Sequence, residues 1–443
     1  MPCPYERRVR RPYERVYRTY VRAPIVVAVL MLIVAGGGYA SAQQGNGSPP
    51  PPIDDTIEAG EADAVEPARR LVRWNEYEGA FFTIRFGGGF LYEYAGYAQD
   101  ENSKAQIDLP PEAKVRDTRV LFKGRLKFKR SVTWSAGFMY DGPTDEWLVR
   151  ETGVMIEMPE ISGHLFVGRS KEGFSLNKIM VGYAGWTQER SMINDATIPI
   201  LADGVKWLGY APKIHLIWNV GAYADWLSEG HGFSTYDNQF VGRVAWLPYL
   251  STDGGRLLHL GINLRYGHPN EGTLKLRSRP ESFPSPYFVD TGDFAAQSTR
   301  MTSLEAYSRR GSVLIGSEYF FQQVDAPESG DPLFHGGEVA ATWLVTGETR
   351  TYNTRGGFFN QVSPARPVFQ GGPGGWELVG RMSYIDLDSG SLRGGRFWRV
   401  TPMVNWYLSD HVRLEMTYGY GTLDRFELRG NTHFFQTRLQ LQM

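Results

Sequence analysis

Basic side chains recur at alternating positions between residues 119 and 129. The row contains Arg119, Lys123, Arg125, Lys127 and Lys129, with Leu121 as its apolar member. The intervening positions are Val120, Phe122, Gly124, Leu126 and Phe128. Arg85 has the same parity in the alternating stretch 82–94. A row of positive charges that faces water attracts anions. The row could lie at a constriction or nearer a rim.

A β-strand must position these charges, because only a period of two places them all on one side. The stretch 131–140 repeats the pattern, with Val132, Trp134 and Phe138 opposite small or polar residues. A strictly apolar face opposite a charged or small one is what lipid outside and water inside require. In a soluble sandwich the apolar face would instead pack on a second sheet.

Strand-like segments continue to residue 443. We place them near 82–94, 119–129, 131–140, 150–158, 162–169, 205–211, 213–227, 237–248, 256–267, 285–290, 299–308, 311–323, 334–345, 375–387, 397–408, 411–421 and 432–443. Bacterial single-chain barrels have even strand numbers. We therefore predict an all-β fold, a transmembrane antiparallel β-barrel of about 16 strands. The spacers 171–204, 268–298, 324–333 and 349–374 would be extracellular or pore-folded loops.

Composition agrees with a membrane barrel. Aromatic residues make up 14% of the chain, yet the mean hydropathy is −0.34. Beyond residue 42 no run of 18 apolar residues offers a spanning helix, so a membrane location requires a closed barrel. Aromatic residues near strand ends would form interfacial girdles. These are Tyr92, Tyr94, Tyr140, Trp218, Trp226, Trp246, Tyr249 and Tyr407.

The first 42 residues have the order of a secretory signal. Seven arginines precede the apolar run Ile25–Val34, and Ala40-Ser41-Ala42 offers a cleavage site. We expect residues 1–42 to be a signal peptide read by the general secretory route. The alternatives are a membrane anchor, for which the apolar run is short, and a twin-arginine route.

Residues 43–72 have the composition of a linker. Four prolines, Pro49 to Pro52, are followed by acidic residues and alanines. We expect a disordered periplasmic lead there, and the barrel at 73–443. Without the signal the chain has no cysteine, 40 basic residues and 46 acidic residues. A disulfide framework is therefore excluded, and the charge does not suggest nucleic-acid binding.

Several stretches resemble the phosphate-selective porin O and P family, which forms sixteen-stranded trimeric anion channels. They are Leu165-Phe-Val-Gly-Arg-Ser-Lys-Glu-Gly-Phe-Ser-Leu176, Gln188-Glu-Arg190, Glu338-Val-Ala-Ala-Thr-Trp-Leu-Val-Thr-Gly-Glu348, Gly375-Trp-Glu-Leu378, Tyr384-Ile-Asp-Leu387, Val404-Asn-Trp-Tyr-Leu408 and the C-terminal 435–443. The resemblance covers most of residues 80–443. It implies a homotrimer in the bacterial outer membrane, in contact with lipid and lipopolysaccharide.

The resemblance also implies site residues. Basic side chains near a constriction attract an anion and partly replace its water. Lys178 and Arg190 match the family's basic positions after the Lys-Glu-x-Phe-Ser-Leu motif, and Arg116 and Arg119 match its arginine-rich second strand. For Lys178 and Arg190 the alternative is a solvated loop charge. The expected pore-lining set is Arg85, Arg116, Arg119, Lys123, Arg125, Lys127, Lys178 and Arg190.

Four positions depart from the family pattern. Asp117 and Asp203 stand where arginine is expected, and Gly89 stands where an arginine often follows two glycines. Acidic groups at a constriction would compete with the anion for the basic ones, so we expect only mild anion selectivity. Met443 replaces the usual terminal Phe.

Other chemistry has little support. The eight histidines have no H-x-x-x-H spacing, and no G-x-S-x-G or P-loop motif occurs. We expect no metal and no cofactor. The sequence favours a passive channel for small anions such as phosphate, with a general or differently selective porin as the alternative. A barrel enzyme would need a catalytic cluster at one rim, and a purely structural barrel would need a plugged lumen.

Overall fold

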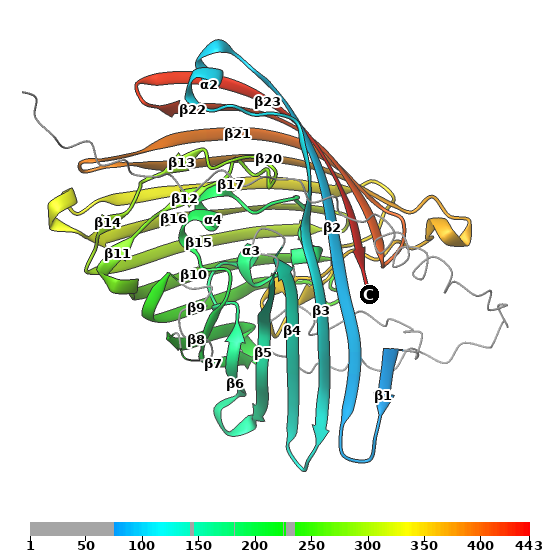
Figure 1. The fold of residues 1–443 in the computed structure, drawn as a ribbon. Coiled ribbons are helices and arrows are strands. Elements are labelled where there is room, and N and C mark those ends of the chain that lie inside the picture. Colours follow the sequence, from blue (N-terminus) through cyan, green and yellow to red (C-terminus); the bar gives the residue numbers. More distant parts are fainter. Residues whose placement is uncertain (1–74, 142–145, 181, 225, 227–234) are drawn as a thin grey trace, which may run out of the picture. The chain divides into compact units, whose positions relative to one another are not determined.

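The chain forms a closed antiparallel barrel of 16 strands in the computed structural model, which describes residues 75–443 apart from 142–145, 181, 225 and 227–234 (Figure 1). The predicted signal and lead, 1–72, lie outside the described residues. The barrel strands are β2 (Thr83–Gln99), β3 (Glu112–Lys127), β4 (Ser131–Asp141), β5 (Glu146–Met158), β6 (Gly163–Ser170), β7 (Ala202–Ala211), β8 (Leu216–Ala224), β9 (Tyr236–Leu250), β10 (Arg256–Pro269), β15 (Ser298–Arg310), β16 (Val313–Asp325), β17 (Leu333–Leu344), β20 (Gly375–Ser389), β21 (Leu392–Tyr407), β22 (Val412–Arg425) and β23 (Leu428–Gln442). Each pairs with its neighbours in chain order, and β23 returns to β2.

Strict alternation builds this wall. In β15, Ser303, Glu305 and Tyr307 point inward and are buried, whereas Leu304 points outward and is 53% exposed. Polar residues therefore collect inside and apolar residues outside, as a membrane barrel requires. The predicted and observed numbers of strands agree because nearly every strand has alternating apolar and polar residues.

Two expectations about individual segments are wrong. Of the predicted strand 285–290, only Val289–Asp290 forms β13, which pairs with β12 (Arg277–Ser278) inside a loop. Tyr407 was expected in an outer girdle, but it faces inward and is buried, and its hydroxyl donates to Glu377 Oε2 (2.7 Å). The apolar character of the ring could not show that Tyr407 packs inside the barrel. It does so because its hydroxyl has a hydrogen-bond partner there, Glu377.

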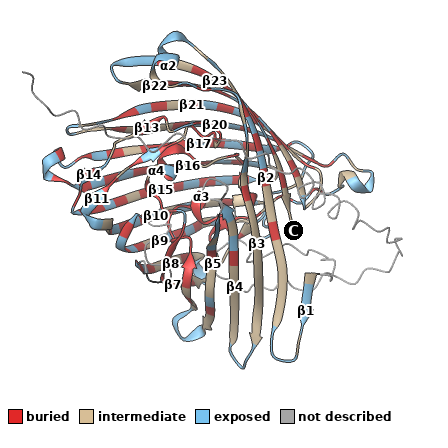
Figure 2. Cartoon of the chain, viewed as in Figure 1, coloured by how far each residue is buried: buried red, intermediate tan, exposed pale blue. Residues whose placement is uncertain are grey.

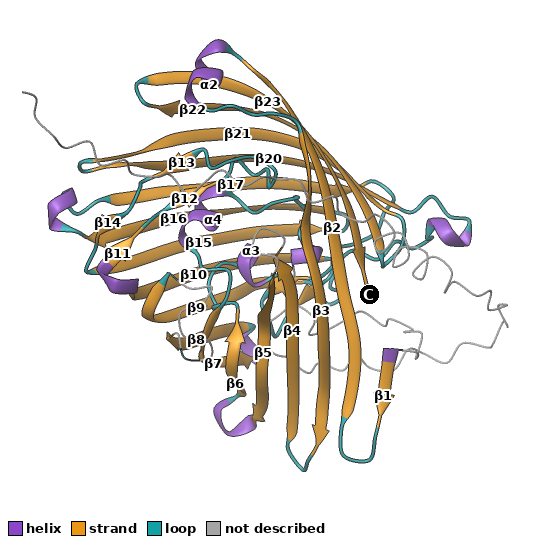
Figure 3. Cartoon of the chain, viewed as in Figure 1, coloured by secondary structure: helices purple, strands orange, loops and turns teal. Residues whose placement is uncertain are grey.

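The connections differ between the two ends of the barrel. One end has short turns and the C-terminus, together with the long segment 345–374, which contains β18 (Tyr352–Asn353), β19 (Phe358–Phe359) and η7 (Val368–Gln370). The other end has four longer loops. Loop 100–111 contains α2 (Glu101–Gln106), and loop 326–332 contains η6 (Pro327–Ser329). Loop 171–201 contains α3 (Leu176–Ile179), η3 (Gly182–Ala184) and α4 (Met192–Thr197), and loop 270–297 contains η5 (Asn270–Gly272), β11 (Thr273–Leu274) and β14 (Phe294–Ala295). The turns contain η2 (Pro159–Ile161) and η4 (Pro212–Ile214). Figure 3 shows how few helices accompany the strands. No helix of the described residues is long and apolar enough to cross a membrane.

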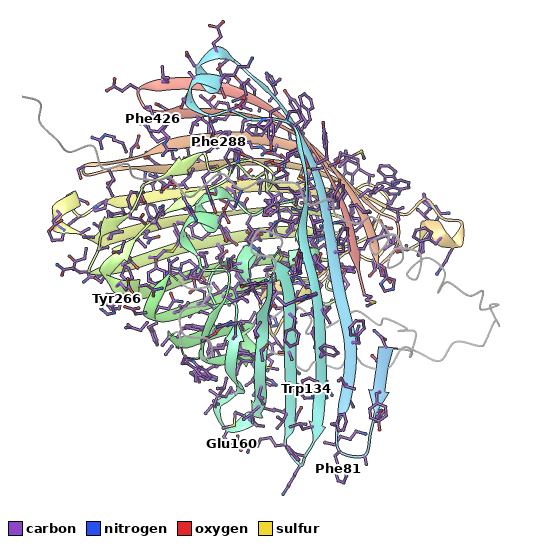
Figure 4. All side chains as sticks on the ribbon, in the orientation of Figure 1. Phe81, Trp134, Glu160, Tyr266, Phe288 and Phe426 are labelled. Atoms are coloured by element: carbon purple, nitrogen blue, oxygen red, sulfur yellow. The ribbon has the colours of Figure 1, made fainter. Side chains whose placement is uncertain are left out.

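Three connections fold into the barrel and pack on its inner face. Phe174 of loop 171–201 stacks on Phe320 of β16, with ring centroids 6.3 Å apart. Phe288 of loop 270–297, labelled in Figure 4, has its ring centroid 5.2 Å from that of Phe397 on β21. Phe359 of segment 345–374 is fully buried. Two of these loops start from the long-loop end, but 345–374 enters from the opposite end, beside the C-terminus. Sequence analysis left open whether these segments are extracellular or pore-folded loops. All three fold into the barrel.

The inner faces of β3 and β4 are more open than those of β15 to β23. Inward side chains of β15 to β23 are mostly buried, whereas those of β3 and β4 are mostly half-exposed, including Lys123, Arg125, Thr133 and Ser135 (Figure 2). The filling of the lumen is therefore uneven, and water reaches the basic row on β3.

The edge of β2 continues past the end of β23. β1 (Glu76–Glu78) pairs with residues 83–85, and Asn75 Nδ2 donates to the Phe86 carbonyl (2.8 Å). Met443 and Gly88 exchange two backbone hydrogen bonds, of 3.0 and 3.1 Å. Three different partners thus hold the backbone of this stretch.

The outward face of β15 yields a stability prediction. Leu304→Arg should lower the free energy of unfolding by about 2–4 kcal/mol, because it places a charge near the middle of the lipid-facing band. Ser308→Arg, close to the strand end, should cost about 0–1 kcal/mol. Denaturant titrations of the protein folded in lipid vesicles would measure both. Equal costs would contradict the lipid-facing placement of Leu304.

Candidate functional site

Loop 171–201 turns from β6 into the lumen and defines the candidate constriction. Its entrance needs a glycine, since a Cβ on Gly173 would lie 2.1 Å from Asn219 Cγ. Ser175 then caps α3, accepting from Lys178 N (3.2 Å), and its hydroxyl donates to Glu318 on β16. Asn177 N also donates to Glu318 (2.9 Å). A carboxylate of the wall therefore holds the start of α3 in place.

Lys178 and Arg190, both expected near the pore, are built into this loop. Lys178 is buried, and its Nζ donates to the Ile198 carbonyl (3.1 Å). Burial, together with the nearby Arg190 charge, lowers the pKa of the Lys178 amine to about 7. Arg190 Nε donates to the Asn177 carbonyl (2.8 Å). Both side chains therefore donate hydrogen bonds to backbone carbonyls of the loop and stabilise its conformation.

Arg116 joins the wall to the loop. It forms a two-point ion pair with Glu189, Nε to Oε1 at 2.8 Å and Nη2 to Oε2 at 3.3 Å. Arg438 of β23 reaches the same carboxylate, at 2.5 Å. Burial alone would raise the pKa of Glu189, but the two guanidinium charges outweigh it and lower the pKa to about 2. The Arg116 side chain keeps 33% of its surface exposed, so it can still meet solute.

The acidic departures are neutralised by arginine. Asp117 is buried and pairs with Arg119, and Arg150 lies 3.7 Å from it. Asp203 is buried and pairs with Arg169 through two contacts of 2.5 and 2.8 Å. Neither aspartate is left as a bare charge. Asp117 does compete with a solute anion for Arg119, as expected, whereas Asp203 occupies Arg169, which lies outside the expected pore-lining set.

Tyr183 occupies the space beside Gly89. A Cβ on Gly89 would lie 2.2 Å from the Tyr183 ring. The Arg119 guanidinium lies over the same ring, with its Cζ 4.6 Å from the ring centroid. An aromatic side chain from the loop therefore fills the place where the family resemblance led us to expect an arginine.

The remaining expected residues line the short-turn half of the β2–β3 inner face. Arg85 and Lys123 are directly paired in the β2–β3 register, and Arg125 and Lys127 follow. Two acidic side chains of β1 approach this row: Glu78 lies 2.8 Å from Lys127, and Glu76 lies 3.8 Å from Arg85. The row thus lies toward one rim, with Arg116 and Arg119 at the loop.

Sequence analysis missed further inward arginines and their acidic partners. The wall and loop pairs are Arg243–Glu305, Arg265–Glu172, Arg350–Glu377, Arg381–Glu281, Arg413–Glu415 and Arg438–Glu93. Strand parity could have identified most of the strand members. It also missed Arg277 and Arg279, which alternate in loop 270–297. Within the described part of the chain, no group of three potential ligands could hold a metal ion.

The lowered pKa of Lys178 yields a pH prediction. Because its pKa is about 7, the amine should be mostly neutral at pH 9 and mostly charged at pH 6. The ratio of chloride to potassium permeability should therefore rise as the pH falls through 7, and Lys178→Met should show a smaller rise. Reversal potentials at both pH values would test this, with Lys213→Met on an exposed turn as the control. A variant that matches the wild-type rise would exclude Lys178 as the titrating group.

Comparisons with known proteins agree with the barrel fold. The family model described as phosphate-selective porin O and P matches residues 85–443. An uncharacterised protein of Caulobacter vibrioides is 28% identical over 182 residues, 40% of this chain and 36% of its own length. OmpT of Vibrio cholerae shares the fold with a TM-score of 0.52 and 12% identity, covering 82% of this chain and 99% of its own. OprB of Pseudomonas putida has a TM-score of 0.52 and 9% identity, covering 81% and 94%.

The family match extends over most of the chain, and the structural matches cover nearly the whole of the solved barrels. The chain therefore belongs to the phosphate-selective porin O and P family and is a passive channel of the bacterial outer membrane.

Proposed function

We propose that the channel passes small anions in preference to cations, with phosphate among the candidate permeants. The observation that carries this proposal is the half-exposed basic face of the β2–β3 hairpin. Lys123, Arg125 and the 33%-exposed Arg116 meet water, while Asp117 and Asp203 are buried against arginines. A permeating anion would therefore meet basic groups that remain hydrated.

The eight expected residues have different parts in this proposal. Arg85, Lys123, Arg125 and Lys127 would concentrate anions along one wall. Arg116 and Arg119 would meet the anion beside loop 171–201. Lys178 and Arg190 would act mainly through the shape and charge of the loop. Phosphate would need several donors around one tetrahedral ion, and three backbone carbonyls already accept from Arg190.

Assembly and activity are part of the proposal. We infer a homotrimer, in contact with outer-membrane lipid and lipopolysaccharide, from the family and from the apolar outer face. OmpT of Vibrio cholerae, a structural neighbour, is described in a trimer form. We also propose that the chain is not an enzyme, since the family and fold favour a channel. A general porin of the same fold is the alternative.

Reversal potentials in a planar bilayer under a potassium chloride gradient would test the selectivity. The wild type should reverse on the anion side. In Lys123→Gln/Arg125→Gln the preference should fall by about two- to fivefold, as expected when unit charges near 4 Å contribute about 1 kcal/mol in water. Lys213→Gln, on an exposed turn, is the matched control.

The same recordings separate the alternatives. Cation preference, or none, in the wild type would overturn anion selectivity while leaving the fold intact. Titrated phosphate then addresses the permeant. Block of the chloride current at low phosphate concentration would support phosphate, and its absence would leave an anion channel of other specificity.

A further inference from the structure

Loop 270–297 crosses the lumen and brings its tip to β3. On one side, Arg399 of β21 donates to the Pro280 carbonyl (2.5 Å) and Arg381 of β20 pairs with Glu281. On the other side, Lys114 Nζ donates to the Pro284 carbonyl (3.2 Å). Contacts with both walls therefore fix residues 280–284 beside the constriction.

Guanidinium groups and aromatic rings alternate from this loop to β3. Arg277 lies over Tyr287, with its Cζ 4.2 Å from the ring centroid, and Arg279 lies 4.4 Å from the same centroid. Arg279 is also 5.3 Å from the Phe283 ring, which Arg116 approaches at 4.5 Å. We call these five residues the guanidinium–ring ladder.

Two arginines of the ladder, Arg277 and Arg279, differ from the other inward arginines in their exposure and partners. Arg277 is exposed, and the other four members are half-exposed. Among the described residues neither Arg277 nor Arg279 has a carboxylate within ion-pair distance, and Arg279 donates only Nε, to the Ser285 carbonyl (2.9 Å). By contrast, Arg243 and Arg350 are buried against glutamates. The ladder therefore keeps N–H donors available to solute.

We propose that the guanidinium–ring ladder recognises planar organic anions, above all aromatic carboxylates, on their way to Arg116. This inference rests on the proposed anion preference and adds the class of solute. A carboxylate binds two N–H donors at the edge of a guanidinium, while the solute ring packs against an aromatic face or a guanidinium plane. The ladder offers guanidinium groups for the carboxylate and planar faces for the solute ring along its length.

The same geometry is less suited to inorganic phosphate. Tetrahedral phosphate gains from several donors that converge on one point, and here each guanidinium packs against at least one aromatic ring. A saturated carboxylate would keep the charge contact but lose the stacking. Benzoate and cyclohexanecarboxylate have equal charge and similar size, so their comparison isolates the contribution of the flat ring.

The test is block of the chloride current by each anion. Benzoate should half-block the wild-type channel at a concentration about three- to tenfold below that of cyclohexanecarboxylate, the range expected for stacking and cation–π contacts. Phe283→Leu/Tyr287→Leu should bring this ratio close to one while leaving the chloride-to-potassium preference near the wild-type value. Tyr249→Leu, on the exposed outer face, should change neither.

Further variants keep the result interpretable. Phe283→Tyr/Tyr287→Phe retains both rings and should retain the ratio, which excludes a simple folding defect. Arg277→Lys/Arg279→Lys keeps the charge but removes the planar groups, so the ratio should fall. Two results would overturn this inference alone while anion preference remains. In the first, benzoate and cyclohexanecarboxylate half-block the channel at equal concentrations. In the second, phosphate is the strongest blocker. Loss of anion preference in the wild type would overturn the proposed function as well.

Discussion

The backbone hydrogen bonds between β2 and β23 are the constraint on which the rest of this structure depends. Lipid offers no partner to an open strand edge, so a spanning sheet must close on itself. Residues 89–99 of β2 pair with residues 432–442 of β23, which joins segments more than 330 positions apart. Closure encloses a space. Side chains of the loops that enter this space lose contact with water and pack on the inner wall.

Inside that space, charge pairing decides what is fixed and what stays accessible. A buried charge costs several kcal/mol unless it is paired and hydrogen-bonded. Arg243 with Glu305 and Arg350 with Glu377 meet this condition and stabilise the filled side of the lumen. On the β2–β3 side the basic residues keep contact with water. The division between structural and solute-facing arginines therefore follows exposure and partners rather than residue type.

The wall could be predicted from the sequence, but the contents of the lumen could not. Alternation is a local property, so it revealed almost every strand and the inward parity of Arg85 and Lys123. The partner of Asp203 is Arg169, on the adjacent strand, and the pairing depends on register. The burial of Lys178 depends on Ile198, across a folded loop. The error at 285–290 has the same origin, since an apolar run can pack inside a barrel as readily as it can join its wall.

The three partners at the edge of β2 have a further consequence. An exposed strand edge is a template on which another chain can add a strand, and natural sheets cover such edges. β1, Asn75 and Met443 cover residues 83–88, where β23 has already ended. A copy that lacked residues 75–78 would still close its barrel, yet it would present a bare edge outside the closed part of the sheet. The short β1 strand thus covers backbone groups of β2 that could otherwise pair with another chain, and this does not depend on any solute.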